Sequence, residues 1–108
     1  MRRINVLEDA AQEAVEAAAW YEEQRSGLGS EFQRAIDAAL DLLEEEIVPL
    51  VPAAGAAGKR GAKRLILQRF PYDVVVLERS TEIVVIAFAH HMRRPGYWRN
   101  RLGSQARK

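Results

Sequence analysis

Residues 64–98, RLILQRFPYDVVVLERSTEIVVIAFAHHMRRPGYW, decide the fold of this chain. They predict three consecutive strands, over residues 63–70, 73–79 and 82–89, because apolar residues alternate or run together between short turns. Two short turns in succession favour an antiparallel meander. The third strand is apolar along its whole length, which is typical of a strand that is covered on both faces.

The chain before residue 63 predicts one short strand and two helices. Residues 3–7 alternate weakly and predict the strand. Residues 9–25 are rich in Ala and Glu, and residues 30–47 carry apolar side chains at the clearest helical spacing in the chain. Residues 26–29 contain two glycines and break the helix, so the two helices should pack as an antiparallel hairpin.

Two local patterns refine these boundaries. Asp9 with Gln12, and Ser30 with Gln33, have the spacing of a capping box, and each pair is expected to begin a helix. Residues 52–61, PAAGAAGKRG, have low sequence complexity and predict a mobile loop.

The order β-α-α-β-β-β predicts an α+β fold, with a helical hairpin packed on one face of a small antiparallel sheet. A chain of 108 residues suits one domain with a modest core. We expect this domain to span residues 1–102, and residues 103–108 to form a disordered basic tail. The other face of the sheet, or its rim, should remain free for Arg69 and the basic residues near the C-terminus.

The composition excludes several classes of protein. The chain has no cysteine, so it has neither disulfides nor a thiolate metal site, which suits a reducing cytoplasm. No apolar run approaches the ~20 residues that a membrane helix needs. The N-terminal residues lack the long apolar stretch of a signal peptide. We expect no metal and no other cofactor.

The charges are distributed unevenly along the chain. Residues 1–46 hold twelve of the fifteen acidic residues against four basic ones, a balance of −8. Residues 47–108 hold three acidic residues against twelve basic ones, a balance of +9. One interpretation is a basic surface that attracts phosphate or an acidic partner. The other is that acidic residues cover the helices and basic residues cap the sheet, with no partner implied.

Four groups of residues carry a resemblance to a known family. They are Trp20-Tyr21-Glu22; Gly27-Leu28-Gly29 followed by Phe32; Arg64-Leu65 leading to Arg69-Phe70-Pro71-Tyr72; and Ala89-His90 leading to Arg94-Pro95-Gly96-Tyr97-Trp98. With these groups in this order, the chain resembles the RelE/ParE family of toxins from bacterial toxin–antitoxin modules. The match covers nearly the whole chain up to about Leu102, and it is closer to the ParE-like plasmid stabilisation proteins.

The resemblance implies a cytoplasmic toxin that a cognate antitoxin neutralises in a toxin–antitoxin hetero-oligomer. In this family the antitoxin lays a segment across the sheet and helices of the toxin. ParE-like members poison DNA gyrase and are not nucleases, whereas RelE-like members cut mRNA on the ribosome. For this chain we expect ParE-like growth inhibition through DNA gyrase. The alternatives are a ribosome-dependent mRNA endonuclease and an inactive binding module of the same fold.

If the chain is a nuclease, three residues are candidates for catalysis without a metal. Arg69 matches the position of a catalytic arginine in RelE-like nucleases and can offer several donors to a phosphate. His90, or His91 beside it, could transfer a proton near neutral pH. Tyr97 could stack on a base or act as an acid. Each also has a structural interpretation, such as stacking on a neighbouring ring, pairing with a nearby acidic residue or closing the edge of the sheet.

A second group of residues is expected to bind nucleic acid or a partner protein. It consists of Arg64, His91, Arg93, Arg94 and Trp98, although Trp98 can equally close the sheet as a hydrophobic lid. The chain departs from the lysine-rich sheet face of RelE-like nucleases, because only one lysine, at position 63, lies on a predicted strand. That departure weighs against strong RNase activity.

Overall fold

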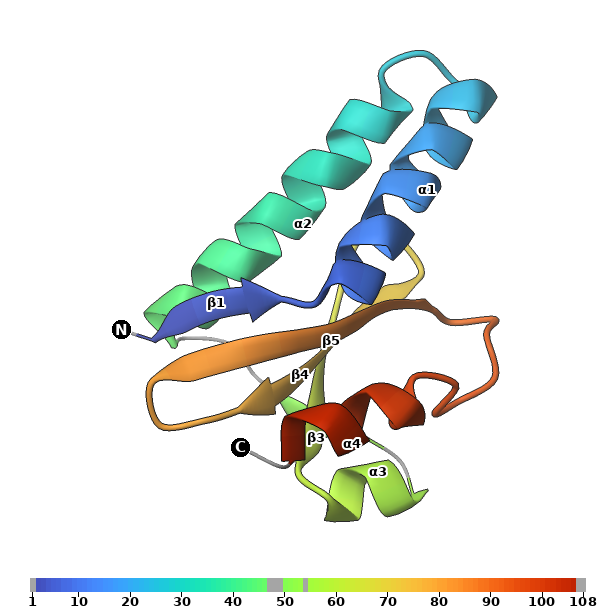
Figure 1. Ribbon diagram of the computed structural model, residues 1–108. Helices are drawn as coiled ribbons and strands as arrows, with labels where there is room; N and C mark the ends of the chain where they lie inside the picture. Colours follow the sequence, from blue (N-terminus) through green and yellow to red (C-terminus); the bar gives the residue numbers. More distant parts are fainter. Residues whose placement is uncertain (1, 47–49, 54, 107–108) are drawn as a thin grey trace.

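The computed structural model describes residues 2–46, 50–53 and 55–106. Its elements, in chain order, are β1 (Arg3–Val6), α1 (Glu8–Gln24), α2 (Leu28–Glu45), β2 (Val51–Pro52), α3 (Gly55–Lys59), β3 (Ala62–Ile66), β4 (Tyr72–Glu78), β5 (Glu82–His90) and α4 (Arg99–Ala106). The five strands form one sheet in the order β1-β5-β4-β3-β2. The predicted α+β class is confirmed, with the helical hairpin on one face of the sheet (Figure 1).

The sheet is mixed rather than purely antiparallel. Strands β3, β4 and β5 form the predicted antiparallel meander. Strand β1 joins it parallel to β5, with Arg3 opposite Glu82 and Val6 opposite Val85. The parallel pairing joins the first strand of the chain to the last, while β2, which follows the hairpin, lies at the opposite edge of the sheet.

The starts of both helices of the hairpin differ from the prediction. The N-cap residues are Leu7 for α1 and Gly27 for α2, and neither cap makes a side-chain hydrogen bond, so the two predicted capping boxes are wrong. Instead, the carboxylate of Glu22 accepts hydrogen bonds from the backbone N–H groups of Gly27, at 2.9 Å, and Gly29, at 3.0 Å. A side chain from the preceding helix thus satisfies donors that a cap would otherwise satisfy.

The first hydrophobic core lies between the hairpin and the sheet. The apolar stripe of α2 is buried as predicted, and none of Phe32, Ile36, Ala39 and Leu43 is more than 4% exposed. Phe32 packs 5.1 Å from the ring of Phe70 in an edge-on contact. This contact ties the turn between β3 and β4 to the second helix.

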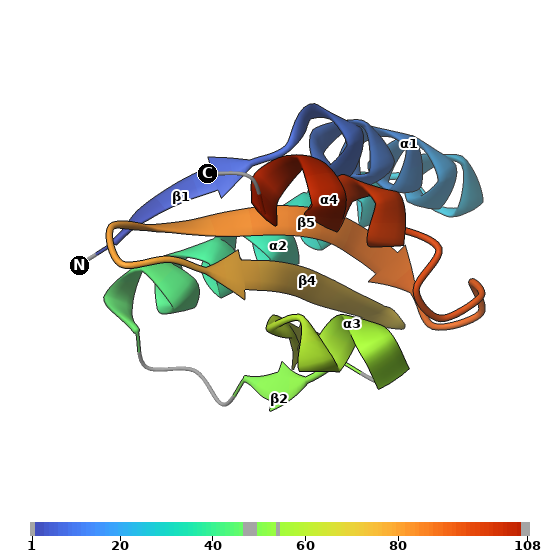
Figure 2. The ribbon, with the colours of Figure 1, turned by 60° about the horizontal axis from the view of Figure 1, so that its bottom comes forward.

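The other face of the sheet is covered, contrary to our expectation. Helix α4 lies across it, with α3 beside it (Figure 2). Trp98, 5% exposed, and Leu102, 2% exposed, form a second core with apolar residues of β4 and β5. The apolar run of β5 already required cover on both faces, and the C-terminal segment supplies the second cover.

The C-terminal segment and the loop before β3 also differ from the predictions. Residues 103–106 continue α4 instead of starting a disordered tail, and residues 107–108 lie outside the described part. Strand β2 and helix α3 occupy most of the predicted mobile loop. Helix α3 passes so close to Ala53 that a Cβ at Gly58 would lie 1.9 Å from its carbonyl oxygen. The predicted boundary of the domain at residue 102 stays a prediction.

The two helices of the hairpin approach closely at Gly29. A Cβ added there would lie 2.5 Å from the carbonyl oxygen of Ala18. We therefore expect Gly29→Ala to lower the free energy of unfolding by about 1–3 kcal/mol, as an overpacked core site does. Urea denaturation followed by circular dichroism measures this change.

Gly103→Ala is the matched control, because its added Cβ meets nothing within 4 Å. It should leave stability unchanged or raise it by less than about 1 kcal/mol. A Gly29→Ala protein as stable as the wild type would contradict the close helix approach.

Candidate functional site

The chain segment between β5 and α4 forms one wall of a pocket that we call the basic pocket. Its volume is about 230 Å³, and it opens on the side of the second core. The pocket is lined by Ala53, Arg64, Asp73, Val75, Ala89, His90, His91, Arg93, Arg94, Pro95, Gly96, Tyr97 and Trp98. All five residues that we predicted to bind nucleic acid or a partner therefore lie around one pocket.

An acidic residue that the sequence analysis did not place in the site, Asp73, also lines this pocket. Its side chain is only 12% exposed, and its two oxygens are both used. One accepts a hydrogen bond from Arg64 at 3.2 Å, and the other lies 2.9 Å from the ring Nε2 of His91. Asp73 therefore engages two of the predicted binding residues inside the protein.

Two arginines of the pocket remain available. Arg93 and Arg94 are exposed and form no ion pair among the residues that the structure describes. The guanidinium carbon of Arg93 lies 3.9 Å from the centre of the Tyr97 ring. Trp98 is buried beneath this wall, so it supports the pocket from the core rather than presenting a free ring.

Arg69 is not part of the basic pocket. It lies in the connection between β3 and β4, and its guanidinium donates a hydrogen bond to Glu31 of α2 at 2.6 Å. This contact places Arg69 on the hairpin side of the sheet, whereas the basic pocket lies on the opposite side. The hydrogen bond from Arg69 lowers the pKa of Glu31 below its ordinary value, with further help from the charge of Arg25. Arg69 therefore does not line the pocket that His90 and Tyr97 line.

His90 is held by structural contacts. Its Nδ1 accepts the backbone N–H of Met92 at 2.9 Å. Its ring meets the ring of Tyr72 edge-on, with 5.0 Å between the centroids. The imidazole thus shapes the turn after β5.

Tyr97 is a poor proton donor to a substrate in this arrangement. Its hydroxyl already donates to Glu13 at 2.6 Å. Burial, followed by the hydrogen bond to Glu13, raises the pKa of Tyr97 far above its ordinary value. The phenol therefore stays protonated near neutral pH and is committed to an internal partner.

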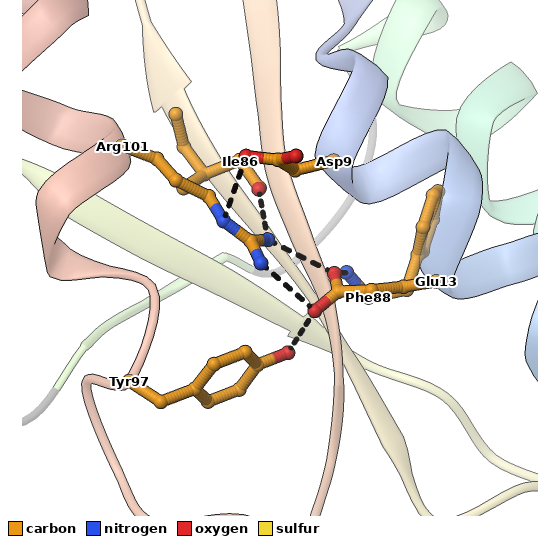
Figure 3. A network of polar contacts seen from close by, with 6 residues as sticks. All are labelled: Asp9, Glu13, Ile86, Phe88, Tyr97 and Arg101. Carbon is orange, nitrogen blue, oxygen red and sulfur yellow. Dashed lines mark hydrogen bonds and ion pairs between the residues drawn. The ribbon is translucent and has the colours of Figure 1, made fainter.

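Glu13 belongs to a polar network at the edge of β5 (Figure 3). Strand β1 pairs with β5 only as far as Val85, so within the described part of the chain the next residues of β5 have no strand beside them on that edge. The carboxylate of Glu13 accepts the backbone N–H of Phe88 at 3.1 Å. Arg101 donates to the carbonyl of Ile86 at 3.0 Å and to Glu13 at 3.0 Å. Two side chains thus take the place of a neighbouring strand.

A β-bulge helps to create this arrangement. Val76 faces Val85 and Val75 faces Ala87, so Ile86 is an extra residue in β5. Ile86 and Ala87 both pack into the second core, while the carbonyl of Ile86 meets Arg101. The sequence analysis missed Glu13 and Arg101, because neither stands in a recognisable motif.

Within residues 2–46, 50–53 and 55–106, no group of three His, Cys, Asp or Glu side chains could hold a metal ion. No helix in this part of the chain is both long and apolar enough to cross a membrane.

A separate apolar groove of about 500 Å³ lies between α2 and β3, and Arg69 is among its lining residues. Leu42 and Ile66 in this groove are 41% and 43% exposed.

Comparison with known proteins supports the fold. No protein-family model and no curated protein sequence matches the chain. A solved structure of the chromosomal ParDE TA system from P. aeruginosa contains a chain with a similar fold, at a TM-score of 0.62 and 14% sequence identity. The similarity covers 83% of this chain and 96% of that one. The chain thus has the ParE-like α+β fold that the resemblance implied.

The edge network provides a test of what holds α4 in place. Arg101→Ala would leave the carbonyl of Ile86 and the carboxylate of Glu13 without this donor. We expect a loss of roughly 1.5–3 kcal/mol in the free energy of unfolding, as for hydrogen bonds to charged groups. Urea denaturation measures it.

Arg99→Ala is the control, because Arg99 is exposed and, within the described ranges, its side chain donates only to the carbonyl of Gly96. The Arg99→Ala substitution should change the free energy of unfolding by no more than about 0.5 kcal/mol. Equal stability of the two variants would show that α4 does not depend on the network.

Proposed function

We propose that this chain is the toxin of a type II toxin–antitoxin module and that it inhibits growth in the cytoplasm by binding a protein target, DNA gyrase. The shared fold with a chain of the ParDE system and the resemblance to ParE-like proteins support the module. The position of Arg69, outside the basic pocket and paired with Glu31, is the main observation that favours binding over RNA cleavage.

Metal-free RNA cleavage needs a base, a cation near the phosphate and an acid, all around one bond. In this chain the three candidates do not converge. Arg69 pairs with Glu31, His90 accepts a backbone hydrogen bond, and Tyr97 donates to Glu13. The negative charge of Asp73 in the basic pocket also opposes a phosphate. This arrangement supports a protein that binds its target without cutting it.

The antitoxin is the second partner in this proposal. We place its acidic residues against Arg93 and Arg94, because these arginines have no ion pair in the described part of the chain. We place its apolar residues in the groove between α2 and β3, where Leu42 and Ile66 are exposed and Arg69 can meet a further acid. Such a segment would cross both the sheet and the helices.

Production of the chain alone should arrest bacterial growth, and co-production of the small protein encoded beside it should restore growth. The purified chain should inhibit supercoiling by DNA gyrase and leave mRNA on translating ribosomes intact. Cleavage of mRNA at fixed codon positions, with supercoiling unaffected, would favour the endonuclease and overturn the gyrase proposal. Absence of growth arrest would favour the inactive binding module.

The role of the basic pocket can be tested by charge reversal. Arg94→Glu should weaken binding of the antitoxin by about tenfold or more, because an attractive contact becomes a repulsive one. Isothermal titration calorimetry with the antitoxin measures this loss. Arg3→Glu is the matched control, because Arg3 is an exposed residue of β1 that pairs with Glu82, at the end of β5 opposite to the basic pocket. Equal affinities of the two variants would remove the basic pocket from the antitoxin interface.

A further inference from the structure

A second pocket lies next to the basic pocket, and we call it the aromatic cup. Its volume is about 260 Å³. It is lined by Glu13, Glu16, Ala17, Trp20, Tyr72, Phe88, His90, Arg93 and Tyr97. We propose that the aromatic cup binds an arginine side chain of the antitoxin, whose guanidinium stacks on Trp20 and pairs with Glu16. The assignment to the antitoxin rests on the function proposed above.

The wall formed by α1 presents an aromatic ring and a carboxylate together. Glu13, Glu16, Ala17 and Trp20 follow one another at helical spacing and therefore share one face of the helix. Trp20 is 56% exposed, which is unusual for so large an apolar side chain. Its ring meets Tyr21 edge-on at 5.2 Å, and Tyr21 packs in turn on Phe70 of the core. The indole is thus held in place while one side remains open to a ligand.

The charges of the cup favour a cation at the α1 wall. Glu13 is already paired with Arg101. Glu16 accepts a hydrogen bond from Gln12 and forms no ion pair with any residue in the described ranges. Arg93 contributes one positive charge, but it lies against Tyr97. Glu16 therefore carries the negative charge that an incoming cation can meet.

The protein itself shows that this environment accepts guanidinium groups. Arg93 lies over the ring of Tyr97 at 3.9 Å, and Arg101 lies 5.5 Å from the same ring. A planar guanidinium gains both from stacking on an aromatic face and from a nearby carboxylate. Trp20 with Glu16 offers the same combination and has no guanidinium of its own among the described contacts.

The position of the cup points to the antitoxin as the source of this arginine. His90, Arg93 and Tyr97 line both the basic pocket and the aromatic cup. A segment whose acidic residues reach the basic pocket is therefore close enough to place a neighbouring side chain in the cup. We infer that this segment carries an arginine near its acidic residues, so that one short stretch meets two neighbouring sites of opposite charge.

A matched pair of short peptides tests the chemistry of the cup. The first is Ac-Gly-Arg-Gly-NH2, and the second replaces arginine by citrulline, which has a similar shape and no charge. The probe is the indole N–H signal of Trp20 in NMR spectra of the full chain, which contains two tryptophans. Trp20→Phe assigns the signal. The arginine peptide should shift it in a saturable way at millimolar concentrations, and the citrulline peptide should not.

Glu16→Gln should weaken binding of the arginine peptide by about fivefold or more, since it removes the ion pair. Asp41→Asn is the control, because Asp41 is an exposed carboxylate on α2 that lines neither pocket. The Asp41→Asn chain should bind the arginine peptide within about twofold of the wild-type affinity. Equal responses to the two peptides, no saturable shift, or equal affinities of the two variants would overturn the proposal.

A growth experiment tests the source of the arginine. Cells that produce the Glu16→Gln chain should need more antitoxin for rescue than cells that produce the Asp41→Asn chain. If both variants need the same amount of antitoxin, the assignment of the cup to the antitoxin is overturned. It is also overturned if the Glu16→Gln chain, produced without antitoxin, no longer arrests growth, because the cup would then belong to the target interface. If the wild-type chain causes no arrest, the proposed function fails, and the peptide titration still decides whether the cup binds a guanidinium.

Discussion

The free edge of β5 is the constraint on which the rest of the structure depends. An unpaired strand edge leaves backbone donors and acceptors that need partners. Glu13 of α1 and Arg101 of α4 provide them, and they also bind one another although 88 positions separate them in the chain. One interaction thus ties both ends of the protein to the sheet. Because it orients α4, it also positions the buried Trp98 beneath the basic pocket.

The uneven charge of the two halves of the chain is partly resolved inside the protein. Acidic residues of the first half pair with basic residues of the second half, as Glu31 does with Arg69 and Glu13 with Arg101. The interpretation without a partner therefore accounts for these charges. It does not account for Arg93 and Arg94, which have no ion pair in the described ranges. Both arginines lie in the short turn after β5, where they line the basic pocket.

That turn separates two pockets of different character. On one side lies the basic pocket, and on the other lies the aromatic cup with Glu16 and Trp20. Groups that could transfer protons, such as His90 and Tyr97, are held in hydrogen bonds that shape these walls. The two pockets thus present both signs of charge on one surface. This arrangement suits a protein that acts by binding, which is the function we propose.

Sequence patterns determined β1, α1, α2, β3, β4 and β5, because helix and strand periodicities are local properties of the sequence, but they did not predict β2, α3 or α4. They predicted the hairpin, the antiparallel meander, the burial of β5 on both faces and the α+β class. Only the tertiary structure decided that α4 covers the second face, that Asp73 joins Arg64 and His91, and that Arg69 turns to Glu31. These outcomes depend on contacts between residues far apart in the chain and on a bulge that changes the register of β5. No local pattern encodes which side chain will meet an unpaired backbone group on a distant strand, so the site could be placed on the sheet but its geometry could not.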